Sequence, residues 1–194
     1  MEALVKGYLL PETLHKAHEG LSPVHRDRLT REERRKGELH GVRDVKEVVV
    51  LVCGHGGRDM RCGVIAPVLR REFEVQFGRQ NIKILNGAVD IPNGEAAHEK
   101  EMLEGEGGGG RAARVAAISH VGGHKYAGNV IVYVPPGWVG EDGKESPLAG
   151  KGIWYGRVEP KHVEGIVRET VGGGRVIADL FRGGVGRDGE VLRM

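Results

Sequence analysis

The sequence predicts an α/β protein in which a mixed β-sheet is flanked by helices. A continuous β-branched run, EVVVLVC at residues 47–53, is typical of a strand buried in a sheet. A segment with helical apolar spacing follows it, and short apolar strands separated by turns come after residue 112. With 194 residues, 39% of them hydrophobic, the chain has material for one core and little room for a second.

Charge balance and glycine content narrow the class of protein. Lys and Arg number 29 against 27 Asp and Glu, and this net charge of +2 gives no sign of nucleic-acid binding. No stretch approaches the roughly 18 apolar residues of a membrane span, so we expect no membrane insertion. Two cysteines cannot form a disulfide scaffold. The 33 glycines predict that much of the chain is loop.

We interpret residues 1–46 as a charged N-terminal arm or helix that precedes a domain at residues 47–194. A helix is expected from Glu12 to Glu19, and the run LTREERRKGEL predicts another with Thr30 as its N-cap. A solvated surface is favoured over a partner-binding patch. Acidic residues such as Glu2 argue against a secretory signal and against an intact mitochondrial presequence.

The domain is expected to open with the strand at residues 47–53, buried on both faces, and to continue with a helix from Cys62 to Gly78. This helix places six apolar residues at helical spacings: Val64, Ile65, Val68, Leu69, Phe73 and Phe77. The alternating segment at 82–85 predicts the next strand. Residues 92–112 lack apolar periodicity and contain four consecutive glycines, which predicts a flexible surface insertion. A phosphate-binding P-loop is disfavoured, because its strand and helix context is missing.

The remaining elements are short strands and one helix. Strands are expected at 113–119, 129–134 and 152–158, and Pro160 introduces a helix through HVEGIVRETV. Strand, helix and strand, followed by a strand pair and a closing helix, is the order of a thioredoxin-like α/β sandwich. We expect that fold for residues 47–194.

The first segment that carries chemistry is CGHGGRDMRCG at residues 53–63. Cys53 ends a buried strand and Cys62 stands at a helix start, where backbone N–H groups lower a thiol pKa, and Arg58 and Arg61 add positive charge. Eight residues separate the cysteines, too many for a thioredoxin-type CxxC pair or a zinc knuckle. A loop of that length can fold around a larger group, although Cys53 could also be a small buried hydrophobe.

The second segment is HVGGHKYAGN at residues 120–129. His120 leaves a strand, and His124 follows across a Gly-Gly turn, so both imidazoles can point at one centre. Spacing alone leaves ligation open, because a lone histidine is more often a surface or hydrogen-bonded residue.

The motifs CxHxxRDxRCG and HxGGHKxAGN, followed by IWYGRV and LFRGG, resemble the sucrase/ferredoxin-like family of thioredoxin-like 2Fe-2S ferredoxins. Its fungal members include an actin-patch-distribution and altered-inheritance-of-mitochondria group. The resemblance covers residues 47–184 apart from the Gly-rich insertion. It implies a thioredoxin-like ferredoxin sandwich and a 2Fe-2S cluster whose ligands, at the matching positions, are Cys53, Cys62, His120 and His124.

Two imidazoles in place of two thiolates remove negative charge from such a cluster. The resemblance therefore implies a reduction potential above the roughly −400 mV of all-Cys plant ferredoxins, and imidazole N–H groups that lose protons on oxidation would couple proton to electron transfer. His55 has the CxH form of a Rieske ligand pair, but no CxxH follows at Cys62, so we place His55 beside the cluster. The other motif residues are expected to order the two loops: Arg58, Asp59, Arg61, Lys125 and Asn129.

We therefore expect an electron-transfer protein rather than an enzyme with its own substrate. Its redox donor and acceptor are unknown, and no nucleic-acid or membrane partner is expected. Two alternatives use the same residues: a structural Cys2His2 zinc domain, and a thiol oxidoreductase in which Cys53 and Cys62 exchange a disulfide. The fungal resemblance favours mitochondria, with the cytoplasm as the alternative.

Overall fold

The structure is a computed structural model that describes residues 2–39, 45–57, 59–87 and 110–193. The chain divides into two compact units, Met1–Arg43 and Asp44–Met194, which we treat as separate bodies. Most of the insertion predicted at 92–112 lies outside the described residues, which resume at residue 110.

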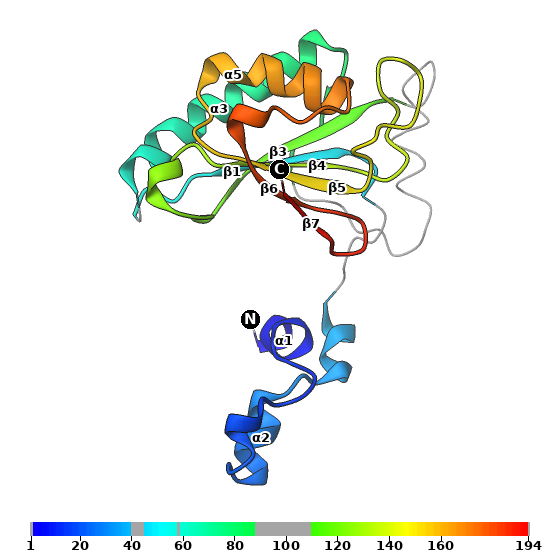
Figure 1. The fold of residues 1–194 in the computed structure, drawn as a ribbon. Helices are drawn as coiled ribbons and strands as arrows, with labels where there is room; N and C mark the ends of the chain where they lie inside the picture. Colours follow the sequence, from blue (N-terminus) through cyan, green and yellow to red (C-terminus); the bar gives the residue numbers. More distant parts are fainter. Residues whose placement is uncertain (1, 40–44, 58, 88–109, 194) are drawn as a thin grey trace. The chain divides into compact units, whose positions relative to one another are not determined.

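In the described part of the C-terminal unit, seven strands form one mixed sheet in the order β2-β3-β1-β4-β5-β6-β7 (Figure 1). Neighbours among β2, β3 and β1 are parallel, whereas every neighbouring pair from β1 to β7 on the other side is antiparallel. The order β3-β1-β4-β5 with its closing helix confirms the predicted thioredoxin-like fold class. The strands are β1 (Val48–Cys53), β2 (Lys83–Ile84), β3 (Ala112–Ile118), β4 (Val130–Val134), β5 (Lys151–Tyr155), β6 (Phe181–Val185) and β7 (Val191–Leu192).

Two helices cover one face of this sheet (Figure 1). Helix α3 (Met60–Arg79) links β1 to β2, and α5 (Pro160–Gly165) continues into a π-helical segment at Ile166–Gly172. Helix α3 begins two residues before Cys62, because the carboxylate of Asp59 accepts the backbone N–H of Arg61 and caps the helix. None of the described helices is long and apolar enough to cross a membrane.

The core lies between the sheet and the two helices. Leu69, Phe73 and Phe77 of α3 are fully buried within it. Val49 and Leu51 point to the other face and are only half-buried, so the prediction that this strand is buried on both faces is wrong. The described helices cover a single face, and the fully buried strand residues alternate accordingly: Val48, Val50, Val52, Val130, Val132, Val134, Ile153 and Tyr155.

Helix α3 also presents apolar side chains to solvent. Helical spacing grouped Val64 and Val68 with Leu69 and Phe73, but the structure leaves both valines largely exposed. The helix therefore has two apolar stripes, and only one of them faces the sheet. Periodicity shows that residues share a face, but it does not show what covers that face.

The predicted strands occur, with shifted ends. Strand β5 stops at Tyr155 rather than at residue 158, because Arg157 turns the chain with a φ of 57°. Strands β6 and β7 form an antiparallel hairpin that the sequence analysis did not predict. β6 contains two glycines and β7 has two residues, so neither shows a strand-like alternation.

The N-terminal unit consists of short helical segments. A single 3-10 turn, Lys16–His18, stands where a helix from Glu12 to Glu19 was predicted. Thr30 ends α2, because its hydroxyl donates to the carbonyls of Arg26 and Asp27; its predicted N-cap role is wrong. The segments are α1 (Glu2–Leu4), a π-helical turn (Val5–Leu9), the 3-10 turn, α2 (Pro23–Leu29) and a 3-10 segment (Glu33–Glu38).

Glu32 is the centre of an ion-pair network in the N-terminal unit. Its carboxylate accepts hydrogen bonds from Lys6, from Arg34 at 3.0 Å and from Arg35 at 3.3 Å. The hydrogen bond from Lys6, followed by that from Arg34, lowers the pKa of Glu32 from 4.5 to about 2. Three cations thus share one carboxylate.

Acid should weaken this unit. Because the folded-state pKa of Glu32 lies below the ordinary 4.5, its ion pairs stabilise the unit fully above pH 4.5, and that contribution is lost as the pH falls through about 2. A carbon-detected NMR titration of the Glu32 carboxyl group should give a midpoint of about 2 in the full chain. Amide exchange in the unit should become faster as the pH falls toward 2, beyond the intrinsic effect of pH. Glu32→Gln should remove this acid effect, whereas the control Glu19→Gln should retain it. A titration midpoint of Glu32 near 4.5 would contradict the ion-pair network.

Candidate metal centre

Three potential metal ligands meet at one edge of the sheet. The sulfur atoms of Cys53 and Cys62 and a ring nitrogen of His120 all lie within 4.8 Å of one another. The Cys53 Sγ is 3.8 Å from the His120 Nδ1. Both cysteines are buried and unbridged, and His120 is half-buried. The structure thus brings together three of the four residues that the sequence singled out as ligands.

The sheet register explains this meeting. Strands β1 and β3 are parallel neighbours in which Cys53 is paired with Ile118, so both strands end at the same edge. His120 follows the end of β3 by two residues, and Cys62 lies in the first turn of α3, which begins after a short loop from β1. In open α/β sheets, binding sites commonly lie at the carboxyl ends of such strands.

The environment of Cys62 favours a neutral thiol in the absence of a cation. Burial raises the pKa of the Cys62 thiol, and the adjacent Cys53 adds to the increase. The backbone N–H of Gly128 donates to Cys62 and lowers its pKa. A metal cation would stabilise the thiolate in the same direction as this N–H group.

Gly128, whose backbone N–H donates to Cys62, was not singled out from the sequence. Its φ is 88°, and a Cβ on it would lie 2.5 Å from the carbonyl oxygen of Val158. Only glycine therefore brings this backbone N–H to the Cys62 sulfur without moving the chain. The sequence signal was present, because Gly128 lies within the HVGGHKYAGN motif.

The first loop, which joins the end of β1 at Cys53 to the start of α3 at Met60, is anchored by Asp59. Its carboxylate accepts the Arg61 backbone N–H at 3.0 Å and pairs with the Arg61 guanidinium at 2.8 Å. His55 is exposed, and its Nδ1 lies 3.3 Å from the hydroxyl of Ser119, outside the group of three donors. Arg58 lies outside the described residues.

Asn129 lies directly beside Cys53. The Cys53 N–H donates to the Asn129 main-chain carbonyl at 3.0 Å, and the Asn129 Oδ1 accepts a hydrogen bond from Arg182. The Asn129 Nδ2 is buried and has no hydrogen-bond partner among the described residues. Because an unpaired buried donor costs about 1–3 kcal/mol, this amide is available for a sulfur or another electron-rich atom.

Arg182 of β6 holds the second loop, residues 120–129. Its guanidinium lies over the Tyr126 ring, 3.9 Å from the centroid, and 5.2 Å from the Trp154 centroid. Gly122, with a φ of 98°, makes room for it, because a Cβ there would lie 2.7 Å from the Arg182 Nη1. The LFRGG motif contains Arg182, but the sequence analysis gave the residue no role.

Lys125 and His124 belong to the same loop. Lys125 is exposed, with its ammonium 4.9 Å from the Tyr126 ring centroid, and its hydrogen bond lowers the pKa of the Tyr126 phenol. His124 begins the 3-10 turn His124–Tyr126, but its side chain lies outside the described residues. Its role as a fourth ligand therefore stays a prediction.

Fold and site together define a thioredoxin-like α/β protein in which two buried cysteines and a half-buried histidine form a group compatible with metal binding. A family model described as Sucrase/ferredoxin-like matches residues 1–183. The chain belongs to this family, which confirms the resemblance.

Three similar curated proteins come from fungi. Altered inheritance of mitochondria protein 32 of Clavispora lusitaniae is 41% identical over 135 residues, 70% of this chain and 34% of the relative. The protein of that name from Meyerozyma guilliermondii is 36% identical over 140 residues, 72% of this chain and 36% of the relative. The protein of that name from Saccharomyces cerevisiae is 31% identical over 170 residues, which are 88% of this chain and 40% of the relative. The chain thus spans well under half the length of these relatives.

Among solved structures, a variant of the thioredoxin-like 2Fe-2S ferredoxin from Aquifex aeolicus is similar to this chain. The match has a TM-score of 0.33 and 18% sequence identity, and it covers 71% of this chain and 97% of that chain.

Replacing Arg182 should loosen the second loop. Arg182→Ala removes the stacking on Tyr126 and leaves the buried Asn129 Oδ1 without its donor, so we expect a loss of about 1–3 kcal/mol in the free energy of unfolding. Arg182→Lys should restore stability only in part, because an ammonium lacks the planar fork. Urea unfolding measures both. The control Arg175→Ala, which removes an exposed ion pair, should lower the free energy of unfolding by less than about 1 kcal/mol. An equally small loss in Arg182→Ala would show that Arg182 does not hold the second loop.

Proposed function

We propose that this protein transfers single electrons through a 2Fe-2S cluster held by Cys53, Cys62, His120 and His124. The observation that carries the proposal is the group of two sulfur atoms and one imidazole nitrogen within 4.8 Å of one another. His124 completes the set because it follows His120 by four residues, across a Gly-Gly turn in the same loop.

The surroundings of the donor atoms support an iron–sulfur cluster. Two histidines replace two cysteines as iron ligands in Rieske centres, so the donor set is a known one. The Gly128 N–H donates to the Cys62 sulfur, and Asn129, whose Nδ2 has no partner among the described residues, lies next to Cys53. Hydrogen bonds of this kind stabilise negative charge on sulfur and tune cluster potentials.

A bound cluster would supply one-electron redox chemistry, at a potential raised by its imidazole ligands. The chain would supply the rest: buried cysteines that exclude water, amide donors near sulfur, and a half-buried His120. A histidine ligand keeps a second ring nitrogen that can exchange a proton with solvent, so proton-coupled redox belongs to the same proposal.

Two other functions would use the same side chains. Zinc accepts two thiolates and two imidazoles, and only metal analysis separates a zinc domain from a cluster domain. A thiol oxidoreductase is disfavoured, because the reactive form is the thiolate and the pKa of Cys62 is raised.

The cellular context is also part of the proposal. An electron carrier without a substrate of its own receives its electron from one redox protein, the donor, and passes it to another, the acceptor. This function requires neither a nucleic acid nor insertion into a membrane. The relatives carry mitochondria in their name, which supports a mitochondrial location over a cytoplasmic one.

Metal and sulfide analysis tests the cofactor. Freshly purified protein should be red-brown, with about two iron atoms and two acid-labile sulfides per chain. Cys62→Ser should lose colour, iron and sulfide yet stay folded, because Asp59 and Arg182 also hold the two loops. His55→Ala, the matched control in the first loop, should keep all three. Colourless protein with stoichiometric zinc, or metal-free protein sensitive to dithiothreitol, would replace this proposal with one of the alternatives.

The histidine ligands should be distinguishable by their potential. In His120→Cys a thiolate replaces a neutral imidazole, so the cluster should gain negative charge and its midpoint potential should fall toward that of all-Cys ferredoxins. His124→Cys should behave alike, whereas His55→Cys should not change the midpoint. Potentiometric titration followed by visible absorption measures the three. A fall in His55→Cys with none in His120→Cys would show that the ligand assignment is wrong.

A further inference from the structure

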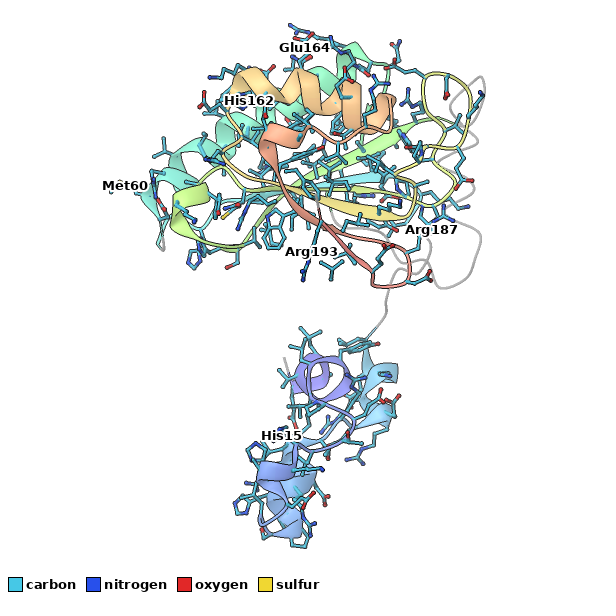
Figure 2. The ribbon with its side chains drawn as sticks, viewed as in Figure 1. His15, Met60, His162, Glu164, Arg187 and Arg193 are labelled. Carbon is cyan, nitrogen blue, oxygen red and sulfur yellow. The ribbon has the colours of Figure 1, made fainter. Side chains whose placement is uncertain are left out.

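A groove of about 900 Å³ opens beside the candidate metal centre. Its walls are the first half of α3, the loop that contains Lys125 and Ala127, and the segment Arg157–Pro160 at the start of α5. Figure 2 labels Met60 at the exposed start of α3, where this groove begins. The groove is therefore walled by the helix turn that carries Cys62 and by the loop that carries His120 and His124.

The floor of the groove is an exposed apolar stripe. Met60, Val64 and Val68 are spaced by four residues on α3, so they lie along one helix face. Their exposed fractions are 77%, 68% and 51%. Contiguous exposed apolar side chains of this kind mark interaction sites in soluble proteins. The described residues do not cover the stripe.

The rim of the groove is predominantly cationic. Arg61, Lys125 and Arg157 line it, and Glu159 is the only carboxylate among the described lining residues. Arg61 is paired with Asp59 at 2.8 Å, so Lys125 and Arg157 carry the excess positive charge. Glu159 is paired with Lys161 at 2.8 Å, outside the groove lining. The exposed Lys125 and Arg157 lie over the Tyr126 ring, and no described carboxylate pairs with either of them. The surface beside the centre thus has an apolar middle and an excess of positive charge around it.

We infer that this groove is the docking site of a protein electron carrier whose contact surface is apolar at its centre and acidic around it. An apolar middle with a charged rim is the usual anatomy of a protein interface, and opposite charges speed encounter and fix orientation. The apolar floor offers no set of converging hydrogen-bond groups, which a small polar ligand would require. The inference names the partner of the proposed electron-transfer site, and so it rests on the proposed function.

The exchange at this surface involves one electron and no bond making. A reduced carrier would lose one electron and the oxidised cluster domain would gain it, or the reverse. Arg61 and Lys125 stand next to Cys62 and His124 in the chain, so a carrier seated in the groove contacts the segments that hold the proposed ligands.

Binding of charged peptides tests the surface independently of redox activity. The probe is a fluorescein-labelled 12-residue peptide of glutamates with one Leu and one Phe, compared with a peptide in which lysines replace the glutamates. The 194-residue chain as purified should bind the acidic peptide at least about tenfold more tightly than the lysine peptide, and this preference should shrink as salt rises. Equal binding of the two peptides would overturn the inference.

Variants locate the binding to the groove. Arg157→Glu reverses a rim charge and Val64→Asp places a charge on the floor, and each should weaken acidic-peptide binding at least about fivefold in fluorescence anisotropy. The matched controls are Lys83→Glu on β2 and Val75→Asp on the exposed side of α3, which lie outside the groove lining and should stay within about twofold of wild type. Controls that weaken binding as much as the groove variants would overturn the assignment.

Two oxidants of opposite charge test whether electrons leave the protein through the groove. Reduced protein should pass one electron to hexacyanoferrate(III), an anion, faster at low salt than at high salt, and hexaamminecobalt(III), a cation, should show the opposite trend. Arg157→Glu should slow the first reaction and speed the second in stopped-flow measurements, and Lys83→Glu should change neither. Unaltered rates in Arg157→Glu would separate the groove from the electron path and overturn the inference.

The outcomes for the groove and for the cluster are separable. Colour, iron and sulfide report on the proposed function, and the groove variants should retain all three. A colourless zinc protein that still prefers the acidic peptide would remove the electron-transfer function but keep an acidic-partner site. A cluster-loaded protein without that preference would keep the proposed electron-transfer function and overturn the acidic-partner site. If sedimentation velocity shows a dimer that Arg157→Glu dissociates, the groove is the contact between two copies of this chain. That result would overturn the inference that an electron carrier docks there.

Discussion

The hydrogen bonds that fix the end of β1 between its two neighbours are the constraint on which the candidate metal centre depends. On one side the Gly54 N–H donates to the Ile118 carbonyl, and on the other the Cys53 N–H donates to the Asn129 carbonyl, both at 3.0 Å. One neighbouring strand leads into His120, and the other begins just after Gly128. A one-residue slip of β1 would turn Cys53 to the opposite face of the sheet and separate the donors.

The loops around the centre are held by contacts other than a metal. Asp59 caps α3 and pairs with Arg61, which fixes the helix turn that carries Cys62. Arg182 stacks on Tyr126 and donates to Asn129, which fixes the second loop. A site that is ordered before it is loaded loses less conformational freedom on binding. This preorganisation distinguishes the domain from small zinc modules, whose folding depends on the metal.

The sequence was sufficient to predict the fold class, and the ends of apolar strands and the start of a helix made Cys53, Cys62 and His120 candidates. Their assignment as ligands came from the family resemblance, because spacing alone left ligation open. It did not reveal Arg182, because that residue reaches the loop only through the pairing of β6 with β5, and β6 lacks strand-like alternation. Thr30 was assigned to the wrong helix end, since a threonine hydroxyl bonds N–H groups at one end and carbonyls at the other. Most of the insertion at 92–112 and the whole His124 side chain lie outside the described residues. The flexibility of the insertion and the ligand role of His124 therefore rest on the sequence alone.

The exposed stripe on α3 follows from the same geometry that buries the cysteine. Successive helix residues point about 100° apart, so a helix that turns Cys62 toward the sheet must turn Arg61 away from it. Val64 and Val68 then follow Met60 at intervals of four along an outer face, while Leu69 packs into the core. The position of the Cys62 sulfur and the exposure of the apolar stripe are therefore not independent features of this helix. A rotation of α3 that exposed the apolar stripe less would also withdraw the Cys62 sulfur from Cys53 and from the Gly128 N–H.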